Sequence, residues 1–420
     1  MPNMAVGMTR AATAIDLPPD IELILDISRL LSRVLHPMPT GVDRVELAYV
    51  RGLQARLGDR LCYGATNPLG FYGRIESRIA EAFFDDLEWR WQGGKKRRWT
   101  RIEAIRQIIR MWPRPIRKPK RQHSRYLIQA SPSHLDKRDR VATKVAREQA
   151  HFVCTVFDLI PIEYPEYARP DGRSIHLARV ETMAALADGL VTISASVAQS
   201  IEPYVMASGR RPIMRPILLG VDLPETLIPP TLDVPAPYFV FISTIEPRKN
   251  HLLLLHAWRR MVEQHGAENV PHLVIVGRRG WENENIVDML ERCETIAGNV
   301  TELSGLSDDA LFPLLAGARA LLFPSFAEGF GMPVAEALSL GTPVICSDIP
   351  ALREAGQDIP DYLDPLDGPG WINAVLDYAK EDSPRRAAQL ERMKDWRTPT
   401  WDAHIDGVLD LIAELERTRP

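Results

Sequence analysis

Short apolar runs recur through the second half of the sequence, and segments long enough to form a helix separate them. The runs are YFVFIST (238–244), HLVIVG (272–277), ARALLFPS (318–325) and TPVICSD (342–348). A strand that helices cover on both faces loses the polar alternation of a half-exposed strand. The pattern therefore predicts an α/β domain built on a doubly wound parallel sheet.

The first half of the sequence carries the same pattern in fewer segments. A helix is predicted to follow Gly41 and to end near Gly58, and strands are predicted at IELILDIS (21–28), FVCTVFDLIP (152–161) and GLVTISAS (189–196). Because 420 residues exceed what one hydrophobic core usually organises, we expect two Rossmann-like domains that face each other across a cleft.

Five prolines in PETLIPPTLDVPAP indicate the connector between the two domains. The predicted division is an N-terminal tail (1–20), a first domain (21–223), a connector (224–237), a second domain (238–399) and a C-terminal amphipathic helix that packs back towards the first domain (400–420).

Composition restricts the class of protein. A formal net charge of -4 gives no global reason to expect a nucleic-acid partner. The four cysteines stand far apart without a CxxC pair, which favours reduced thiols and a cytoplasmic location. The first 20 residues lack the apolar block of a signal peptide, and no apolar stretch reaches the roughly 18 residues of a membrane span. We therefore expect neither an exported nor an integral membrane protein.

Two carboxylates flank a glycine-rich turn in FAEGFGMPVAEALSLGTPVICSD (326–348). Glu328 precedes the turn, and Glu336 is predicted in the first turn of a helix over 332–340. The amides at such a helix start, at the carboxyl edge of a parallel sheet, form an anion site. A carboxylate can accept two hydrogen bonds, which suits the paired hydroxyls of a sugar. The alternative is that Glu336 only interacts favourably with the helix dipole.

STIEPRKN (243–250) places Arg248 and Lys249 on a loop at the same sheet edge. Two fixed cations there could neutralise a pyrophosphate leaving group. An Asp-x-Asp pair often holds a metal ion for this purpose, but the chain contains none, so no metal site is predicted. The alternative is a solvated basic turn.

The motifs EPRKN, IVGRRGW (275–281), LFPSFAEGFGMPV and SDIPALRE (347–354) together resemble the C-terminal half of family 4 (GT4) retaining glycosyltransferases, which have the GT-B fold. The resemblance spans about residues 238–395. In the first half, DISRL, TGVDRVE, VFDLIPIEYPEY and TIS resemble the N-terminal domain of bacterial members that act on surface polysaccharides, often with a mannose donor.

The resemblance implies a role for each matching residue. Glu328 would contact the transferred sugar, and Glu336 would bind the ribose of the nucleotide. Arg248 and Lys249 would hold the diphosphate. The backbone amides of Phe330, Gly331 and Met332 would bind the sugar or the phosphate. Gly41 would let the first-domain loop approach the donor. No cofactor is implied, because the nucleotide sugar, with GDP-mannose favoured, is a substrate.

The first half departs from the family at one position. Many relatives have His-Asp before LIP, where this chain has Phe157-Asp158. Asp158 remains a candidate for orienting or deprotonating the acceptor hydroxyl. His176 could replace the missing histidine or could be structural. The change puts acceptor or donor specificity, and with it activity, in question.

Residues 95–125 carry 13 Lys and Arg against one acid, Glu103. Apolar side chains recur there at helical spacing, from Trp99 to Trp112, with arginines around them. Such a helix could lie on the anionic inner face of the cytoplasmic membrane. It could also pack on its own domain with a solvated face, bind an acidic or pyrophosphate-linked acceptor, or bind nucleic acid.

The sequence therefore predicts a retaining glycosyltransferase that moves a hexose, with mannose favoured, from a nucleotide sugar to a glycan or lipid-linked glycan in bacterial surface polysaccharide synthesis. Two alternatives stay open. One is a nucleotide-sugar epimerase or phosphorylase on the same fold, and the other is a catalytically silent protein that binds nucleotide sugars.

Overall fold

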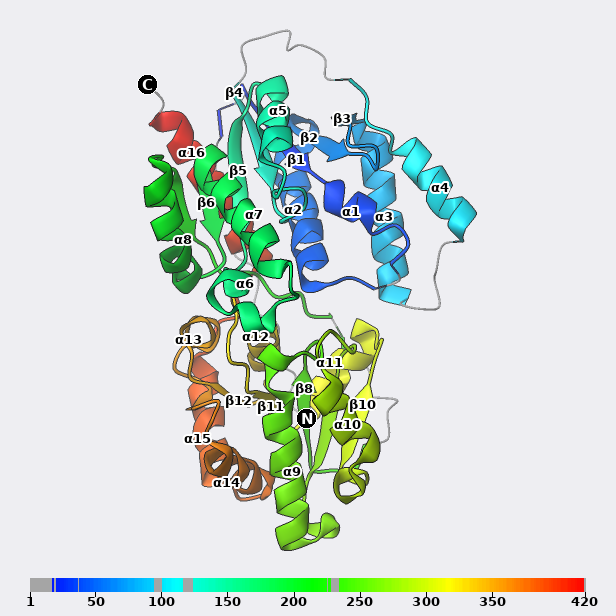
Figure 1. Ribbon diagram of the computed structural model, residues 1–420, viewed down its shortest axis with the longest axis vertical. Coiled ribbons are helices and arrows are strands. Elements are labelled where there is room, and N and C mark those ends of the chain that lie inside the picture. The colour runs from blue at the N-terminus through cyan, green and yellow to red at the C-terminus, as the bar shows by residue number, and fades with distance from the viewer. Residues whose placement is uncertain are drawn as a thin grey trace.

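Two mainly parallel sheets with covering helices lie one above the other in the computed structural model of the protein (Figure 1). The structure describes residues 17–18, 20–36, 38–93, 100–115, 124–224, 226–227 and 234–418. Among these residues the first sheet has seven strands and the second has six, which confirms the predicted α/β class with two Rossmann-like domains.

The first sheet has the strand order β3-β2-β1-β4-β5-β6-β7, and all its neighbours are parallel except β2 and β3. The second sheet has the order β10-β9-β8-β11-β12-β13 and is parallel throughout. The first strands are β1 (Ile21–Asp26), β2 (Leu61–Thr66), β3 (Tyr72–Ile75), β4 (Ser124–Gln129), β5 (His151–Val156), β6 (Gly189–Thr192) and β7 (Ile213–Pro216). The second set is β8 (Tyr238–Ile242), β9 (His272–Val276), β10 (Val300–Leu303), β11 (Leu321–Phe323), β12 (Val344–Ser347) and β13 (Asp361–Leu363).

Helices cover both faces of each sheet (Figure 1). Those of the first domain are α1 (Ser28–Ser32), α2 (Gly41–Leu57), α3 (Ser77–Gly93), α4 (Arg101–Arg110), α5 (Arg138–Glu148), α6 (Ile160–Glu163), α7 (Gly172–Leu186) and α8 (Ala195–Ser208). Those of the second are α9 (His251–His265), α10 (Glu284–Arg292), α11 (Asp308–Ala316), α12 (Met332–Ser339), α13 (Pro350–Gly356), α14 (Gly368–Ala379) and α15 (Pro384–Arg392), and the last helix of the chain is α16 (Trp401–Arg417).

The central strands form because both of their faces are covered. Phe239, Val240 and Phe241 of β8 are fully buried, as are the middle residues of β9 and β12. The strand predicted over 152–161 is too long, since β5 ends at Val156 and the chain then turns into α6. This turn places Asp158 at the carboxyl edge of the first sheet instead of inside it.

Helix α16 returns to the first domain after the chain has completed the second. Its His404 is buried and bonds through Nε2 to the hydroxyl of Tyr49 on α2, at 2.9 Å. The two stretches of chain that connect the domains run side by side, because the amide of Val221 donates to the carbonyl of Pro399 at 2.9 Å. Figure 1 shows α16, in red, against the first domain.

Each sheet reverses its strand order at one point, between β1 and β4 in the first sheet and between β8 and β11 in the second. Ligands of such sheets bind at the carboxyl ends of the strands beside this switch point. The segment after β5 and the segment after β6 both contact the segment after β11, and the segment after β6 also contacts α13, which follows β12. The carboxyl edges of the two sheets therefore meet at the domain boundary.

Candidate active site

A cluster of cations and acids lies at the switch point of the second sheet. Arg248 and Lys249 sit in the short 3-10 turn after β8, and Glu328 follows β11. Because β8 and β11 are neighbours, the two loops meet. Nζ of Lys249 bonds to Oε1 of Glu328 at 2.5 Å, and Nη1 of Arg248 bonds to Oε2 at 3.0 Å. The structure thus brings together three residues that the sequence predicts to act on one ligand.

Burial and charge set the state of these groups. The side chain of Glu328 is only 8% exposed, and burial alone would raise its pKa. The positive charges of Lys249 and Arg248 outweigh this effect and hold the pKa of Glu328 at about 2. Glu328 is therefore a permanently ionised hydrogen-bond acceptor and not a proton donor. Burial also lowers the pKa of Lys249, against the opposing charge of Glu328.

The two cations differ in their capacity for a ligand. Arg248 donates to the carbonyl of Ala327 and to the carboxylates of Glu246 and Glu328. Lys249 donates to Glu328, the one acceptor that bonds its ammonium group among the described residues. Since an ammonium group has three N–H donors, Lys249 can bind further oxygen atoms.

The glycine turn lies directly against the first domain. Gly331 has a φ of 105°, in the left-handed region that only glycine adopts easily. A Cβ atom on Gly329 would stand 2.1 Å from the carbonyl oxygen of Phe157 and 3.3 Å from Cβ of Asp158. Glycine at 329 is therefore required for this close approach, which places Asp158 beside the turn.

Asp158 and His176 also lie together. Oδ1 of Asp158 accepts a hydrogen bond from the amide of Ile160 at 3.1 Å, and Nε2 of His176 bonds to the backbone carbonyl of Asp158 at 2.8 Å. His176 thus supports the backbone of this loop. The side chain of Phe157 packs partly buried against the core, so it fills space where the family histidine is expected.

The amides of the glycine turn lie at the start of α12. Gly331 is the N-cap of α12, and the helix begins at Met332. In the described part of the chain, no hydrogen-bond acceptor is found for the backbone amides of Phe330, Gly331 and Met332. These are the amides that the resemblance assigns to sugar or phosphate.

Glu336 lies in a different environment from Glu328. The prediction that it occupies the first turn of the helix is wrong, because Glu336 is the fifth residue of α12. Burial raises its pKa to about 7, with the negative charges of Asp308 and Asp222 adding to the effect and the positive charge of Arg44 opposing it. The two glutamates therefore differ at neutral pH: one is always ionised, and the other is close to its titration midpoint.

Arg44 and Asp308 join the two domains, and the sequence reasoning missed both. Two hydrogen bonds of 2.7 Å link the guanidinium group of Arg44, on α2, to the carboxylate of Asp308 at the start of α11. A cavity of about 710 Å³ lies beside this pair and is lined by both domains. The sequence signal that could have pointed to Arg44 is its position three residues after Gly41, on the same helix α2.

Gly41 is the first residue of α2 and does not have a positive φ. A Cβ atom there would meet no other atom within 4 Å. The fold itself therefore does not require glycine at this position, and the open space beside it is compatible with the predicted approach of the donor.

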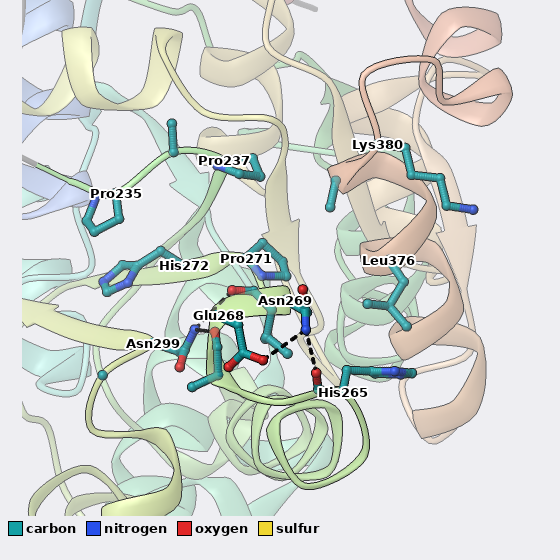
Figure 2. A pocket seen from close by; sticks show the side chains of 15 residues that line it. Pro235, Pro237, His265, Glu268, Asn269, Pro271, His272, Asn299, Leu376 and Lys380 are labelled. Carbon is teal, nitrogen blue, oxygen red and sulfur yellow. Dashed lines mark hydrogen bonds between the residues drawn. The ribbon is translucent and has the colours of Figure 1, made fainter.

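A second large cavity, of about 930 Å³, lies at the opposite, amino edge of the second sheet. Figure 2 shows the residues that line it. Its walls include Pro237, His272 and Asn299, which stand at the amino ends of β8, β9 and β10. The amide group of Asn299 bonds to the backbone carbonyls of Ala267 and Val270, at 2.9 Å each, and His272 bonds to Thr301. These polar groups hold the loops together. The described residues also include no group of three or more acidic, histidine or cysteine side chains that could hold a metal ion.

Several known glycosyltransferases are similar to this chain in sequence. Residues 228–358 match the family model described as glycosyl transferases group 1. The serotype-specific mannosyltransferase WbdA of Escherichia coli is 31% identical over 229 residues, which are 50% of this chain and 28% of WbdA. O-antigen chain mannosyltransferase B of Escherichia coli is 34% identical over 165 residues, 39% of this chain and 42% of that protein. The chain thus matches less than half the length of either relative.

Among solved structures, Anabaena Alr3699/HepE in complex with UDP and glucose has a TM-score of 0.58 and 13% identity, and the match covers 94% of this chain and 99% of that one. At this identity the likeness shows the fold alone. The second half of the chain therefore carries a glycosyl transferases group 1 domain, and the chain as a whole has the two-domain GT-B fold.

Proposed function

We propose that the protein is a GT4-type retaining glycosyltransferase of bacterial surface polysaccharide synthesis. It transfers a hexose, with mannose favoured, from a nucleotide sugar to a glycan or lipid-linked glycan. The observation that carries the proposal is the cluster of Arg248, Lys249 and Glu328 at the switch point, with Asp158 of the first domain beside it. The similarity to two mannosyltransferases supports the choice of sugar and pathway.

The proposed roles follow from charge and position. Lys249, Arg248 and the amides of the glycine turn bind the diphosphate, where they stabilise the negative charge that grows as the bond to the sugar breaks. Glu328 accepts hydrogen bonds from hydroxyls of the transferred sugar, and Glu336 accepts them from the ribose. Asp158 orients the acceptor hydroxyl or removes its proton. The reaction needs no cofactor, since the nucleotide sugar is itself consumed.

Binding of nucleotide sugars tests this proposal first. A ligand that binds only the folded state raises the thermal unfolding temperature. Among GDP-, UDP-, ADP- and dTDP-sugars, we expect GDP-mannose to give the largest rise. Product should then form only when an acceptor glycan is present. Change of the sugar without acceptor would indicate an epimerase, sugar phosphate formed from glycan and phosphate would indicate a phosphorylase, and binding without turnover would indicate a silent binding protein.

We further propose that the enzyme works at the inner face of the cytoplasmic membrane, which it touches through α4. Residues 95–99 and 116–123 of the basic stretch lie outside the described residues, and α4 spans Arg101–Arg110 between them. Three isoleucines on α4 are strongly exposed: Ile102 at 64%, Ile105 at 56% and Ile109 at 64%. Their spacing of three and four residues puts them on one face of the helix.

The exposed face of α4 is unlike that of a helix packed on its own domain. The helix meets the core through Ala104 and, in part, Ile108, and its arginines 101, 106 and 110 are exposed. Figure 1 shows α4, in cyan, at the outer side of the first domain, away from the second. An apolar stripe bordered by arginines suits an anionic lipid surface. No helix among the described residues is long and apolar enough to span a bilayer.

Vesicle flotation measures this contact. We expect the protein to float with vesicles that contain anionic lipid and not with neutral ones, and salt should weaken the binding. Replacing Ile102, Ile105 and Ile109 with glutamine should reduce the bound fraction about tenfold or more, because each loses buried apolar area. The control is Met206→Gln, an exposed apolar side chain on α8. Unchanged flotation of the triple variant would contradict the proposal.

A further inference from the structure

Ser194 of the first domain holds the glycine turn of the second domain. It is the N-cap residue of α8, and it is fully buried. Its hydroxyl donates a hydrogen bond of 2.8 Å to the backbone carbonyl of Gly329, the first residue of the turn between Glu328 and Met332. A side chain of one domain thus fixes a peptide group in the proposed donor site of the other.

The hydrogen bonds around Ser194 leave no ambiguity about which group donates. A hydroxyl has one proton and two acceptor positions. The proton of Ser194 goes to Gly329, the amide of Val197 donates to Oγ at 3.2 Å, and the hydroxyl of Ser196, at 3.0 Å, must then donate as well. All three positions of the Ser194 hydroxyl are occupied, so its orientation is fixed.

Fixing this carbonyl also fixes the next amide. In a planar trans peptide the carbonyl and the amide that follows point in opposite directions. Because the carbonyl of Gly329 points to Ser194, the amide of Phe330 points away from the first domain's α8. The carbonyl of Phe157, also in the first domain, lies where a Cβ atom on Gly329 would clash. Two groups of the first domain therefore contact Gly329.

A second contact keeps the domains together at the same place. The carboxylate of Glu354, on α13, accepts hydrogen bonds from the amides of Ala195 at 2.5 Å and of Ser196 at 2.8 Å. These amides belong to the first turn of α8, where no carbonyl of the helix itself can accept from them. Figure 1 shows α13 next to α8 at the domain boundary. Three consecutive residues of the first domain are thus bonded to the second.

We propose that Ser194 is a positioning residue for donor binding, because its hydrogen bond to the carbonyl of Gly329 sets the conformation of the glycine turn. The inference rests on the proposed function for its kinetic consequence, but not for its structural one.

The test combines hydrogen–deuterium exchange with kinetics for Ser194→Ala and Ser194→Thr. In Ser194→Ala, the amide of Val334, which donates to the carbonyl of Gly331 in the turn, should exchange about fivefold to tenfold faster, as expected for the loss of one hydrogen bond. KM for GDP-mannose should rise by a similar factor while KM for the acceptor stays the same. Threonine keeps the hydroxyl and should restore both values.

Ser383→Ala is the matched control. Ser383 is also a buried N-cap serine, and its hydroxyl accepts from the amide of Arg386 at the start of α15. Ser383→Ala should lower thermal stability as much as Ser194→Ala does, without changing exchange of the Val334 amide or KM for the donor. If Ser194→Ala does not fold, Ser194→Cys is measured instead, because a thiol is a weak donor of nearly the same size.

The outcomes separate this inference from the proposed function. The inference is overturned if the Val334 amide exchanges at the wild-type rate in Ser194→Ala, or in Ser194→Cys where that variant takes its place. It is also overturned if Ser383→Ala accelerates this exchange equally. If GDP-mannose is not a substrate, the proposed function fails, and the exchange measurement still decides the role of Ser194.

Discussion

Replacing Glu328 with glutamine is expected to lower the rate of hexose transfer by about 10²- to 10³-fold, the usual effect of removing one charged group that acts in the transition state. The carboxylate lies between Lys249 and Arg248 and is ionised at all working pH values, since its pKa is about 2. Glutamine has the same shape but presents no charge to the sugar. The measurement is kcat with saturating donor and acceptor.

The same change must also affect stability, and a double variant separates the two effects. Breaking a buried ion pair on one side commonly costs on the order of 3 kcal/mol, because an unpaired charge stays buried. Glu328→Gln should therefore lower the free energy of unfolding, and adding Lys249→Met should recover part of it. Transfer should stay lost in the double variant. If transfer returned together with stability, Glu328 and Lys249 would be structural residues only.

Donor affinity should fall as the pH drops below about 7, by up to tenfold per pH unit. The cause is Glu336, whose pKa burial raises to about 7. The ionised carboxylate can accept a ribose hydroxyl at each of its two oxygens, whereas the protonated acid carries an O–H on one of them. Glu336→Gln should weaken donor binding about 10- to 100-fold at pH 8 and make the remaining affinity independent of pH. Calorimetric titration with GDP-mannose between pH 6 and pH 8 measures both effects.

Stability moves in the other direction, which provides the control. A carboxyl group whose pKa is higher in the folded than in the unfolded state binds more protons when folded. The contribution of Glu336 to stability is therefore fully present below pH 4.5, its unfolded value, and is lost as the pH rises through about 7. Protonation of Glu336 at pH 6 therefore stabilises the fold, so weaker donor binding at that pH cannot be explained by unfolding caused by Glu336. A dissociation constant that is flat from pH 6 to pH 8 in the wild type would contradict the assignment of Glu336.

The sequence predicts the parts of the fold and the site that depend on local patterns. Strands β8, β9, β11 and β12 are apolar on both faces, and their runs were visible. Strands β10 and β13 were missed, because they lie at the edges of the second sheet and each of their residues is only partly buried. The encounter of Lys249 with Glu328 was predictable, since loops at the carboxyl ends of neighbouring parallel strands must meet.

Contacts between the domains were beyond such reasoning. Arg44 and Asp308 are 264 residues apart in the chain, and Ser194 and Gly329 are 135 apart. No local periodicity encodes which loops of two separate sheets touch. The environment of Glu336 was missed for the same reason, because the charges that surround it include Arg44 of the other domain.

Transfer from GDP-mannose to a mannose-terminated oligosaccharide, with the anomeric configuration of the new linkage determined by NMR, tests the central claim most directly. The account predicts an α-linked product from the α-linked donor, formed only when the acceptor is present, and its loss in Glu328→Gln. A β-linked product, or a protein that binds GDP-mannose and never transfers the sugar to a glycan, would contradict it.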